Sequence, residues 1–412
     1  MSTVIEVGLS SSLTLENGMV IKNRLFKSAM SEGLGTRDHN PKPDLATLYK
    51  TWADGGIGLM MTGNVMIERT ALGEPGNVVL DDQSDLSEFR RWAEAGKAND
   101  AHIWMQLNHP GKQIPNFVCK EPVAPSAIGL ENGLEKGFNK PRALTEPEIE
   151  TIIQKFATSA RLAKETGFQG VQIHGAHGYL VSQFLSPRHN QRDDQWGGSL
   201  ENRMRFVLCV FSAIRAEVGD DYPIGIKLNS ADFMRGGFTE EESMEVVKAL
   251  ADAGIDQIEI SGGTYESPAM VGQDIKESTL KREAYFLEYA EKVRALVSTS
   301  LVVTGGFRSA KGMLGALESG ATDMVGVARS MAIDPAFPNR LLSDPNAGIE
   351  LRKLSTGITA IDQMAMLDVT WYENQLALMG QGKKPNPNLN PWISFFKTIR
   401  TMGAYALRSR RA

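Results

Sequence analysis

The sequence predicts an α/β protein built as a (β/α)8 TIM barrel, with an N-terminal β-hairpin and a C-terminal helical extension. Three observations support this prediction. Short apolar runs recur along the chain, helical patterns lie between them, and the glycine-rich turn of a dinucleotide-binding sheet does not occur. A barrel of this kind forms one domain of roughly 200 to 400 residues, which fits a chain of 412 residues.

The first predicted element is a hairpin at about residues 12–22. Asn17-Gly18 stands between alternating apolar residues, which is the pattern of a tight two-residue turn between paired strands. Because the hairpin directly precedes the first barrel strand, we expect it to plug the bottom of the barrel.

Eight short apolar runs are the predicted barrel strands. Several are apolar almost throughout, as expected of strands that are buried on both faces of a parallel sheet. Eight is also the number of strands that closes this barrel. The runs are Leu25–Met30, Gly58–Thr62, His102–Leu107, Gly170–His174, Pro223–Leu228, Asp256–Ser261, Ser300–Thr304 and Asp323–Val327.

Helical patterns separate these runs. Thr145–Glu148 and Thr239–Glu242 have the spacing of a capping box, in which Thr and Glu side chains satisfy the first N–H groups of a helix. A doubly wound sheet is the competing architecture, but it usually carries Gly-x-Gly-x-x-Gly after its first strand. Other helical patterns are Leu45–Ala53, Leu86–Ala98, Arg203–Glu217, Phe286–Val297 and Ala310–Ser319.

The chain divides into two predicted parts. Residues 1–345 form the predicted TIM-barrel domain, and residues 346–412 form the predicted C-terminal helical extension. Gly111–Arg142 carries four prolines and is predicted to be a long loop after the third strand, at the end of the barrel where active sites lie. Gly380–Pro391 is rich in turn residues and is predicted to be irregular.

Composition and charge exclude several classes of protein. The formal net charge of −5 argues against a nucleic-acid partner. The two cysteines, Cys119 and Cys209, are too few for a disulfide framework, a Cys₄ zinc site or a cysteine-ligated iron–sulfur cluster. Without a signal-peptide pattern or a run of about 18 apolar residues, we expect a cytoplasmic protein with no integral membrane segment.

The most informative segment runs from His174 to Arg203 and begins at the end of the fourth strand. Polar residues at this end of a barrel strand point into the active site. His174 and His177 can both donate hydrogen bonds to one oxygen atom, and Tyr179 can donate a proton. Structural histidines are the alternative. A zinc site would need a further ligand at suitable spacing, so no metal is predicted.

This segment closely resembles the Old Yellow Enzyme family of FMN-dependent oxidoreductases. The resemblance covers roughly residues 10–340 and is most specific in the run His174–Leu180 and in Gly197–Arg203. It implies an enzyme that passes a hydride from NADPH or NADH to FMN and then to an activated alkene, a nitro compound or a quinone-like acceptor. Further matching pieces are Lys22–Leu25, Gln106–Gly111, Ala124–Ile128, Thr304–Phe307, Gly326–Arg329 and Asp334-Pro335.

The resemblance implies a role for each catalytic residue. His174 and His177 are expected to hold a carbonyl or nitro oxygen of the substrate, and His174 also lies against the flavin. Tyr179 is expected to protonate the α-carbon of the alkene. Gln106 is similar to the glutamine that hydrogen-bonds the pyrimidine edge of the flavin. A polar residue filling a layer of the barrel is the alternative for Gln106.

Two cofactor positions depart from the family pattern. Lys227 stands where the family usually has Arg, and it is expected near flavin N1 and O2, where a cation stabilises the reduced flavin. An interior lysine paired to a carboxylate is its alternative. Ser31 stands beside flavin O4, where the family often has Thr or Cys.

The remaining cofactor contacts follow strand ends. Glycine allows the backbone to approach a phosphate closely, and the loops after strands seven and eight are where barrels commonly bind phosphate. Generic glycine-rich turns are the alternative there. The expected flavin contacts are Ala29, Met30 and Asn64, and the expected phosphate contacts are Gly305, Gly306, Gly326, Ala328 and Arg329.

Two other functions remain open from the residues alone. A Schiff-base aldolase would use Lys227 with the phosphate site, and a non-catalytic flavin-binding protein would use the site without turnover. The tail Trp392–Arg411 carries five cations and no acidic residue. We expect it to pack on the barrel or on a homodimer partner, with a membrane surface as the alternative.

Overall fold

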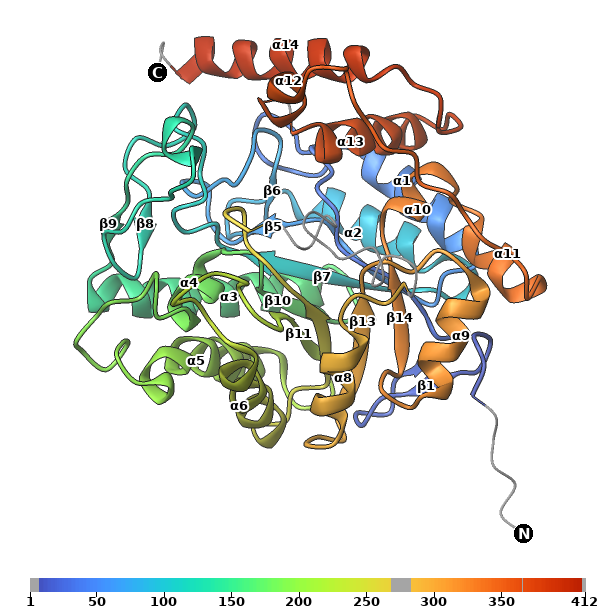
Figure 1. The fold of residues 1–412 in the computed structure, drawn as a ribbon, viewed down its shortest axis with the longest axis horizontal. Helices are drawn as coiled ribbons and strands as arrows, with labels where there is room; N and C mark the ends of the chain where they lie inside the picture. Colours follow the sequence, from blue (N-terminus) through green and yellow to red (C-terminus); the bar gives the residue numbers. More distant parts are fainter. Residues whose placement is uncertain (1–6, 268–282, 365, 410–412) are drawn as a thin grey trace.

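Eight parallel strands close into a barrel in the computed structural model, which describes residues 7–267, 283–364 and 366–409 (Figure 1). Each strand pairs with the next along the chain and the last pairs with the first, which confirms the predicted (β/α)8 architecture. The barrel strands are β3 (Leu25–Lys27), β4 (Leu59–Met61), β7 (His102–Asn108), β10 (Val171–Gly175), β11 (Ile224–Asn229), β12 (Gln257–Ser261), β13 (Ser300–Thr304) and β14 (Met324–Val327).

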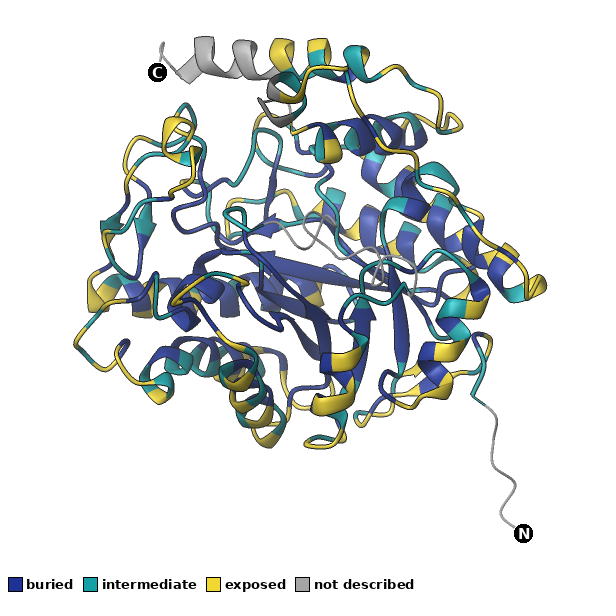
Figure 2. Cartoon of the chain, viewed as in Figure 1, coloured by how far each residue is buried: buried dark blue, intermediate teal, exposed yellow. Residues whose placement is uncertain are grey.

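Helices cover the outside of the barrel and turn their apolar faces inward. The capping boxes at Thr145 and Thr239 form as predicted, with the Thr and Glu side chains both engaged. Figure 2 shows the dark blue buried residues on the barrel strands and on the inner faces of these helices. The helices are α1 (Pro43–Asp54), α2 (Leu86–Gly96), α3 (Glu146–Glu165), α5 (Leu200–Val218), α6 (Glu240–Asp252), α8 (Leu287–Arg294) and α9 (Ala310–Glu318).

The predicted hairpin forms from β1 (Leu13–Thr14) and β2 (Val20–Ile21), which pair antiparallel. Leu13, Leu15 and Ile21 pack against side chains inside the barrel, Trp104 among them. This cluster lies at the end of the barrel away from the catalytic loops, so the hairpin plugs the bottom as expected (Figure 1).

Several short elements lie in the connections. β5 (Val65–Met66) and β6 (Val78–Val79) continue the sheet beyond β7, and neither was predicted. Within the long loop after β7, β8 (Val123–Ala124) pairs with β9 (Arg142–Ala143). The other short helices are η1 (Ala98–Asp100), η2 (Leu134–Lys136), α4 (Leu180–Leu185), α10 (Arg329–Ile333) and α11 (Phe337–Ser343).

The C-terminal extension is helical, as predicted. It contains α12 (Thr359–Met364), α13 (Leu367–Gly380) and α14 (Pro391–Ser409), and the segment between the last two is irregular. α13 packs on α1 and joins the main apolar core, while α14 lies outermost (Figure 1). Arg410 and Arg411 of the basic tail lie outside the described residues. None of the described helices is long and apolar enough to cross a membrane.

Candidate active site at the carboxyl ends of the strands

The loop after β10 brings the two predicted histidines and the tyrosine together. The ring centroids of His174 and His177 lie 5.1 Å apart, and those of His174 and Tyr179 lie 4.8 Å apart. His177 adopts a φ of 62°, which turns the chain back over the strand end. The three side chains therefore contact one another at the carboxyl end of β10.

Burial sets the protonation of this group. It lowers the pKa of His174 and of His177 well below the ordinary histidine value, and the nearby Lys227 cation lowers both further. Both rings are therefore neutral at pH 7. His174 Nδ1 accepts a hydrogen bond from the Ala176 N–H at 3.3 Å, so Nε2 carries the proton and is free to donate. His177 Nε2 lies 2.8 Å from Ser261 Oγ.

Tyr179 has a partner that the sequence did not reveal. Its hydroxyl lies 2.8 Å from that of Tyr265, which follows β12. Burial and the neighbouring Tyr265 raise the pKa of Tyr179 well above its usual value, so the phenol stays protonated. Asn64 Oδ1 is buried and has no hydrogen-bond partner among the described residues. The Asn64 side chain lies close to Tyr179, whose pKa it lowers against the larger effect of burial.

A chain of buried polar side chains lies inside the barrel. Gln106 Nε2 donates to Gln172 Oε1 at 2.7 Å, and Gln172 Nε2 donates to Glu259 Oε2 at 2.9 Å. Lys227 Nζ lies 3.0 Å from Glu259 Oε1. In the barrel register His174, Lys227 and Glu259 stand side by side on β10, β11 and β12. Glu259 thus balances the charge of Lys227.

The ion pair with Glu259 bears on the aldolase alternative. A Schiff base forms only on a neutral amine. Lys227 Nζ is held in an ion pair with the Glu259 carboxylate 3.0 Å away, and Ser28 and Thr304 also hydrogen-bond the same carboxylate oxygen. The geometry therefore does not favour a nucleophilic Lys227.

Ser31 lies between two carboxyl groups that were not expected. Its hydroxyl hydrogen-bonds Glu74, and it lies 2.7 Å from Glu373 Oε1, which comes from α13 of the extension. Burial, together with repulsion from Glu373, raises the pKa of Glu74 to about 8. Burial also raises the pKa of Glu373. The C-terminal extension thus reaches the mouth of the barrel. Ala29 and Met30 lie half-buried beside Ser31.

The ends of β13 and β14 form the expected glycine-rich corner. Gly305 and Gly306 adopt φ values of 127° and 89°, and a side chain on Gly306 would lie 2.5 Å from the Tyr285 ring. Gly326 has no room for a side chain either, because a Cβ there would lie 1.9 Å from Thr304 Oγ1. Ala328 precedes α10, and Arg329 begins it.

Arg329 has no ion-pair partner among the residues that the structure describes. Its charge is felt by Tyr372 of α13, whose pKa it lowers against the larger effect of burial. A half-buried, uncompensated guanidinium beside tight glycine turns has the donor set that binds a phosphate. Together with the unused acceptor of Asn64 and the amide of Gln106, this corner fits the phosphate and the polar ring edge of FMN.

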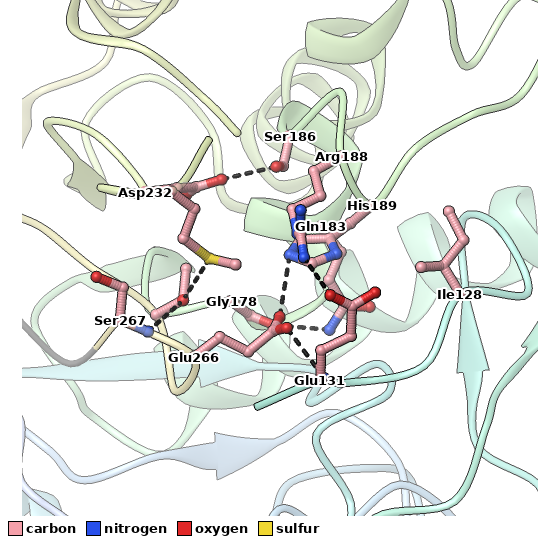
Figure 3. A network of polar contacts seen from close by, with 12 residues as sticks. Ile128, Glu131, Gly178, Gln183, Ser186, Arg188, His189, Asp232, Glu266 and Ser267 are labelled. Carbon is pink, nitrogen blue, oxygen red and sulfur yellow. Dashed lines mark hydrogen bonds and ion pairs between the residues drawn. The ribbon is translucent and has the colours of Figure 1, made fainter. Parts of the chain in front are cut away.

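Ion pairs and hydrogen bonds hold the loops above the site in place (Figure 3). Arg188 Nη2 contacts Glu131 at 2.6 Å, and the Glu131 N–H donates to Glu266 Oε1 at 3.0 Å. Ser186 Oγ donates to Asp232 at 2.6 Å. These contacts connect the loops after β7, β10, β11 and β12, which positions the two loops that carry Tyr179 and Tyr265.

A comparison with known protein families shows which family this chain belongs to. Residues 10–346 match the model of the NADH:flavin oxidoreductase / NADH oxidase family. The chain belongs to this family. Its members, the Old Yellow Enzyme homologues among them, use FMN with NADH or NADPH as the electron donor. This chain is therefore an FMN-dependent oxidoreductase, which confirms the resemblance inferred from its motifs.

Individual relatives of the NADH:flavin oxidoreductase family agree with this assignment. The NADH-dependent flavin oxidoreductase iliE of Hypocrea jecorina (strain QM6a) is 38% identical over 362 residues, which cover 82% of this chain and 89% of the relative. An Old Yellow Enzyme homologue from Zymomonas mobilis has a TM-score of 0.71 at 25% identity, covering 83% of this chain and 94% of that one.

A longer solved structure also matches this family member. A 2-naphthoyl-CoA reductase in complex with 2-naphthoyl-CoA has a TM-score of 0.78 at 27% identity, with 90% of this chain aligned. The aligned part spans 58% of that reductase, so the present chain is similar to one portion of it.

Proposed function

We propose that this oxidoreductase reduces an activated alkene, such as an enone, an enal or a nitroalkene, or a quinone-like acceptor, in a ping-pong reaction with NADH or NADPH. The observation that carries the proposal is the contact of two neutral histidines and a protonated tyrosine with one another at the carboxyl end of β10. Hydrogen-bond donors and a proton source are what the reduction of a polarised C=C bond requires.

The residues that would hold FMN are arranged around the carboxyl end of the barrel. When bound, FMN supplies the centre that accepts a hydride from the nicotinamide and passes it to the acceptor. Gln106, Lys227 and Ser31 offer polar contacts to the ring system. Arg329 and the glycine-rich corner would bind the phosphate, with backbone N–H groups at the start of α10.

The two histidines would bind the substrate oxygen. Neutral imidazoles are suited to this task, because each can donate a hydrogen bond to the substrate oxygen. The proton that the α-carbon receives would come from a different group. The free Nε2–H of His174 is one donor. The second donor, His177, now contacts Ser261 and would exchange that contact for the substrate. Both bonds strengthen as negative charge develops on the oxygen.

Tyr179 would deliver the proton. Its hydroxyl stays protonated, and Tyr265 lies within hydrogen-bond distance to support the phenolate that forms when the proton leaves. The reduced nicotinamide and the acceptor would occupy the same position in turn, because each must exchange a hydride with the same centre of the bound flavin. When the nicotinamide must leave before the acceptor binds, the kinetics are of the ping-pong type.

An absorption spectrum tests the proposal most directly. We expect the purified protein to show the visible bands of oxidised flavin, and these bands to bleach when NADH or NADPH is added without oxygen. Addition of an enone should then restore them. A protein that bleaches with the nicotinamide but is reoxidised by no alkene or quinone would contradict the proposed acceptors while leaving the family assignment intact.

A double variant tests the role of the histidines. His174→Ala with His177→Ala should keep FMN and its reduction by dithionite, an electron donor that needs no binding site. Alkene reduction should fall by about 100-fold or more, because two oxygen-binding donors are lost. His39→Ala, which alters a histidine in the loop before α1, is the control and should leave the rate unchanged. Undiminished alkene reduction in the double variant would overturn the assigned role.

A further inference from the structure

Helix α14 is oriented unusually for an outer helix. Its Ser394 side chain is fully buried and accepts a hydrogen bond from Asn374 of α13 at 2.9 Å. On the opposite side Ile393, Phe396 and Ile399 are 54%, 64% and 43% exposed. The polar contact thus faces the protein and the large apolar side chains face outward, which is the reverse of an ordinary surface helix.

The exposed apolar side chains are concentrated in this part of the molecule. Of the eight large apolar residues that are exposed in the described structure, five belong to the C-terminal extension. Three of the five form the outward stripe on α14, and Trp392 lies partly exposed beside them. Figure 1 shows α14 along one edge of the molecule, and Figure 2 shows exposed residues on its described turns. A contiguous apolar stripe of this kind marks an interaction surface.

Charge is segregated toward the same region. The 39 residues after Glu373 contain seven Lys and Arg and no Asp or Glu, so they carry +7. The whole chain carries −5, and the first 373 residues therefore carry −12. Arg400 is exposed on the described turns of α14 beside the apolar stripe, and Lys397, also exposed, interacts in addition with Glu373 of α13. A basic flank on an outward apolar stripe is the pattern of a helix that binds an anionic surface.

We propose that α14 docks the enzyme on the surface of a membrane that contains anionic lipids. Phe396, Ile393 and Ile399 would enter the boundary between headgroups and acyl chains, while the cations contact the lipid phosphates. The helix has 19 residues and a length of about 28 Å, and it would lie in the plane of the surface. This inference does not depend on the acceptor proposed above.

The charge pattern favours a bilayer over a second copy of the chain. In a two-fold dimer the same patch faces itself, so the basic segments of both copies would be brought together. Like charges at short distance oppose such an interface unless acidic groups intervene, and this segment has none. An anionic lipid surface supplies the opposite charge and an apolar layer at once.

Vesicle binding by the full-length flavoenzyme tests the proposal. We expect it to float with vesicles of phosphatidylcholine and phosphatidylserine, to bind phosphatidylcholine alone weakly, and to dissociate at high salt because the cations are screened. Ile393→Ser with Phe396→Ser should weaken binding roughly tenfold or more, because two inserted apolar side chains are lost. NADH oxidation without vesicles should not change.

A matched variant controls for apolar exposure in general. Val20→Ser with Leu296→Ser removes two side chains that are 55% and 50% exposed on the barrel, and it should bind the vesicles like the unaltered enzyme. The proposal is overturned if the enzyme does not bind the anionic vesicles, or if the α14 variant binds them as well as the barrel variant does. It is likewise overturned if sedimentation shows a dimer that the α14 variant abolishes and no vesicle binding.

Discussion

Glu74 is an acid that the folded protein holds in its protonated form. Ser31 hydrogen-bonds it, Glu373 of α13 lies on the other side of the same hydroxyl, and two carboxylates so close cannot both ionise readily. A carboxyl group with a pKa of about 8 can exchange a proton at neutral pH. Its position beside the residue expected near flavin O4 makes it a candidate proton store for the active site.

The raised pKa of Glu74 predicts a pH dependence of stability. Between the unfolded value of 4.5 and the folded value of about 8, the folded protein binds a proton that the unfolded chain releases. The free energy of unfolding should therefore fall as pH rises through this window, by up to about 1.4 kcal/mol per pH unit. Glu74→Gln should flatten that fall, as measured by urea unfolding at pH 6 and pH 8.

Glu318→Gln is the control for this measurement, because Glu318 is exposed on α9. It should leave the slope of stability against pH unchanged. If Glu74→Gln and Glu318→Gln show the same slope as the unaltered protein, Glu74 is not held protonated by the fold.

The sequence predicts the catalytic residues better than it predicts their partners. His174, His177 and Tyr179 lie on one short loop, so a local motif is enough to find them. Their partners Ser261 and Tyr265 follow a different strand, and only the closed barrel brings them near. Glu259 did leave a signal: it is a charged residue in the middle of an apolar run, and such a residue needs a buried partner.

At the scale of elements, the hairpin acts as the floor of the barrel. Ile21 is fully buried against side chains of the barrel interior, whereas Val20, its neighbour on the same strand, is 55% exposed. Ile21→Ala should lower the free energy of unfolding by about 2–5 kcal/mol, because it leaves a cavity. Val20→Ala should change it by less than about 0.5 kcal/mol. Equal effects of both variants in urea unfolding would show that the hairpin does not plug the barrel.

The corner formed by β13, β14 and α10 should distinguish FMN from riboflavin. Both ligands have the same ring system, but only FMN has the phosphate that Arg329 would bind. Arg329→Ala should weaken FMN binding about 10- to 100-fold, because a charge-assisted hydrogen bond is lost, and should leave riboflavin binding unchanged. Fluorescence titration of the flavin-free protein measures both affinities.

Arg340→Ala on α11 is the matched control, since Arg340 is already paired with Asp334. It should affect neither flavin. If Arg329→Ala weakens the binding of FMN and of riboflavin to the same extent, Arg329 stabilises the fold and does not bind the phosphate.

Sequence patterns locate the elements well, and their limits have physical causes. Five of the eight barrel strands lie within their apolar runs, and β7, β10 and β11 each extend one residue beyond theirs. The runs locate the strands because a strand buried on both faces needs continuous apolar residues. The two-residue strands β5 and β6 are too short to show any period, so they were missed. The first strand ends at Lys27 and not at Met30, because the chain then bends toward the site.

At the scale of the whole molecule, the C-terminal extension contributes to the same core as the barrel. Leu367, Trp371, Leu376 and Met379 of α13 are buried in the main apolar cluster. We therefore predict that residues 1–345 do not make a stable enzyme by themselves, although the sequence suggested a boundary there. Removal of residues 346–412 should lower the melting temperature and the FMN content.

A shorter truncation separates the two helices of the extension. A chain ending at residue 390 keeps α13 and Glu373 but lacks α14, whose outer face is exposed. It should melt within a few degrees of the full chain and turn over NADH at the same rate. If the chain ending at residue 345 behaves equally well, the barrel is an independent domain.

The backbone of His177 restricts what this position can become during evolution. Its φ of 62° lies in the left-handed region, where β-branched residues are strongly disfavoured and Asn, Asp and Gly are tolerated. A single base change converts a histidine codon into one for Asn or Asp, and of these only Asn retains an N–H donor. Among single-base changes, Asn is therefore the substitution at position 177 that keeps both the backbone conformation and a hydrogen-bond donor for the substrate.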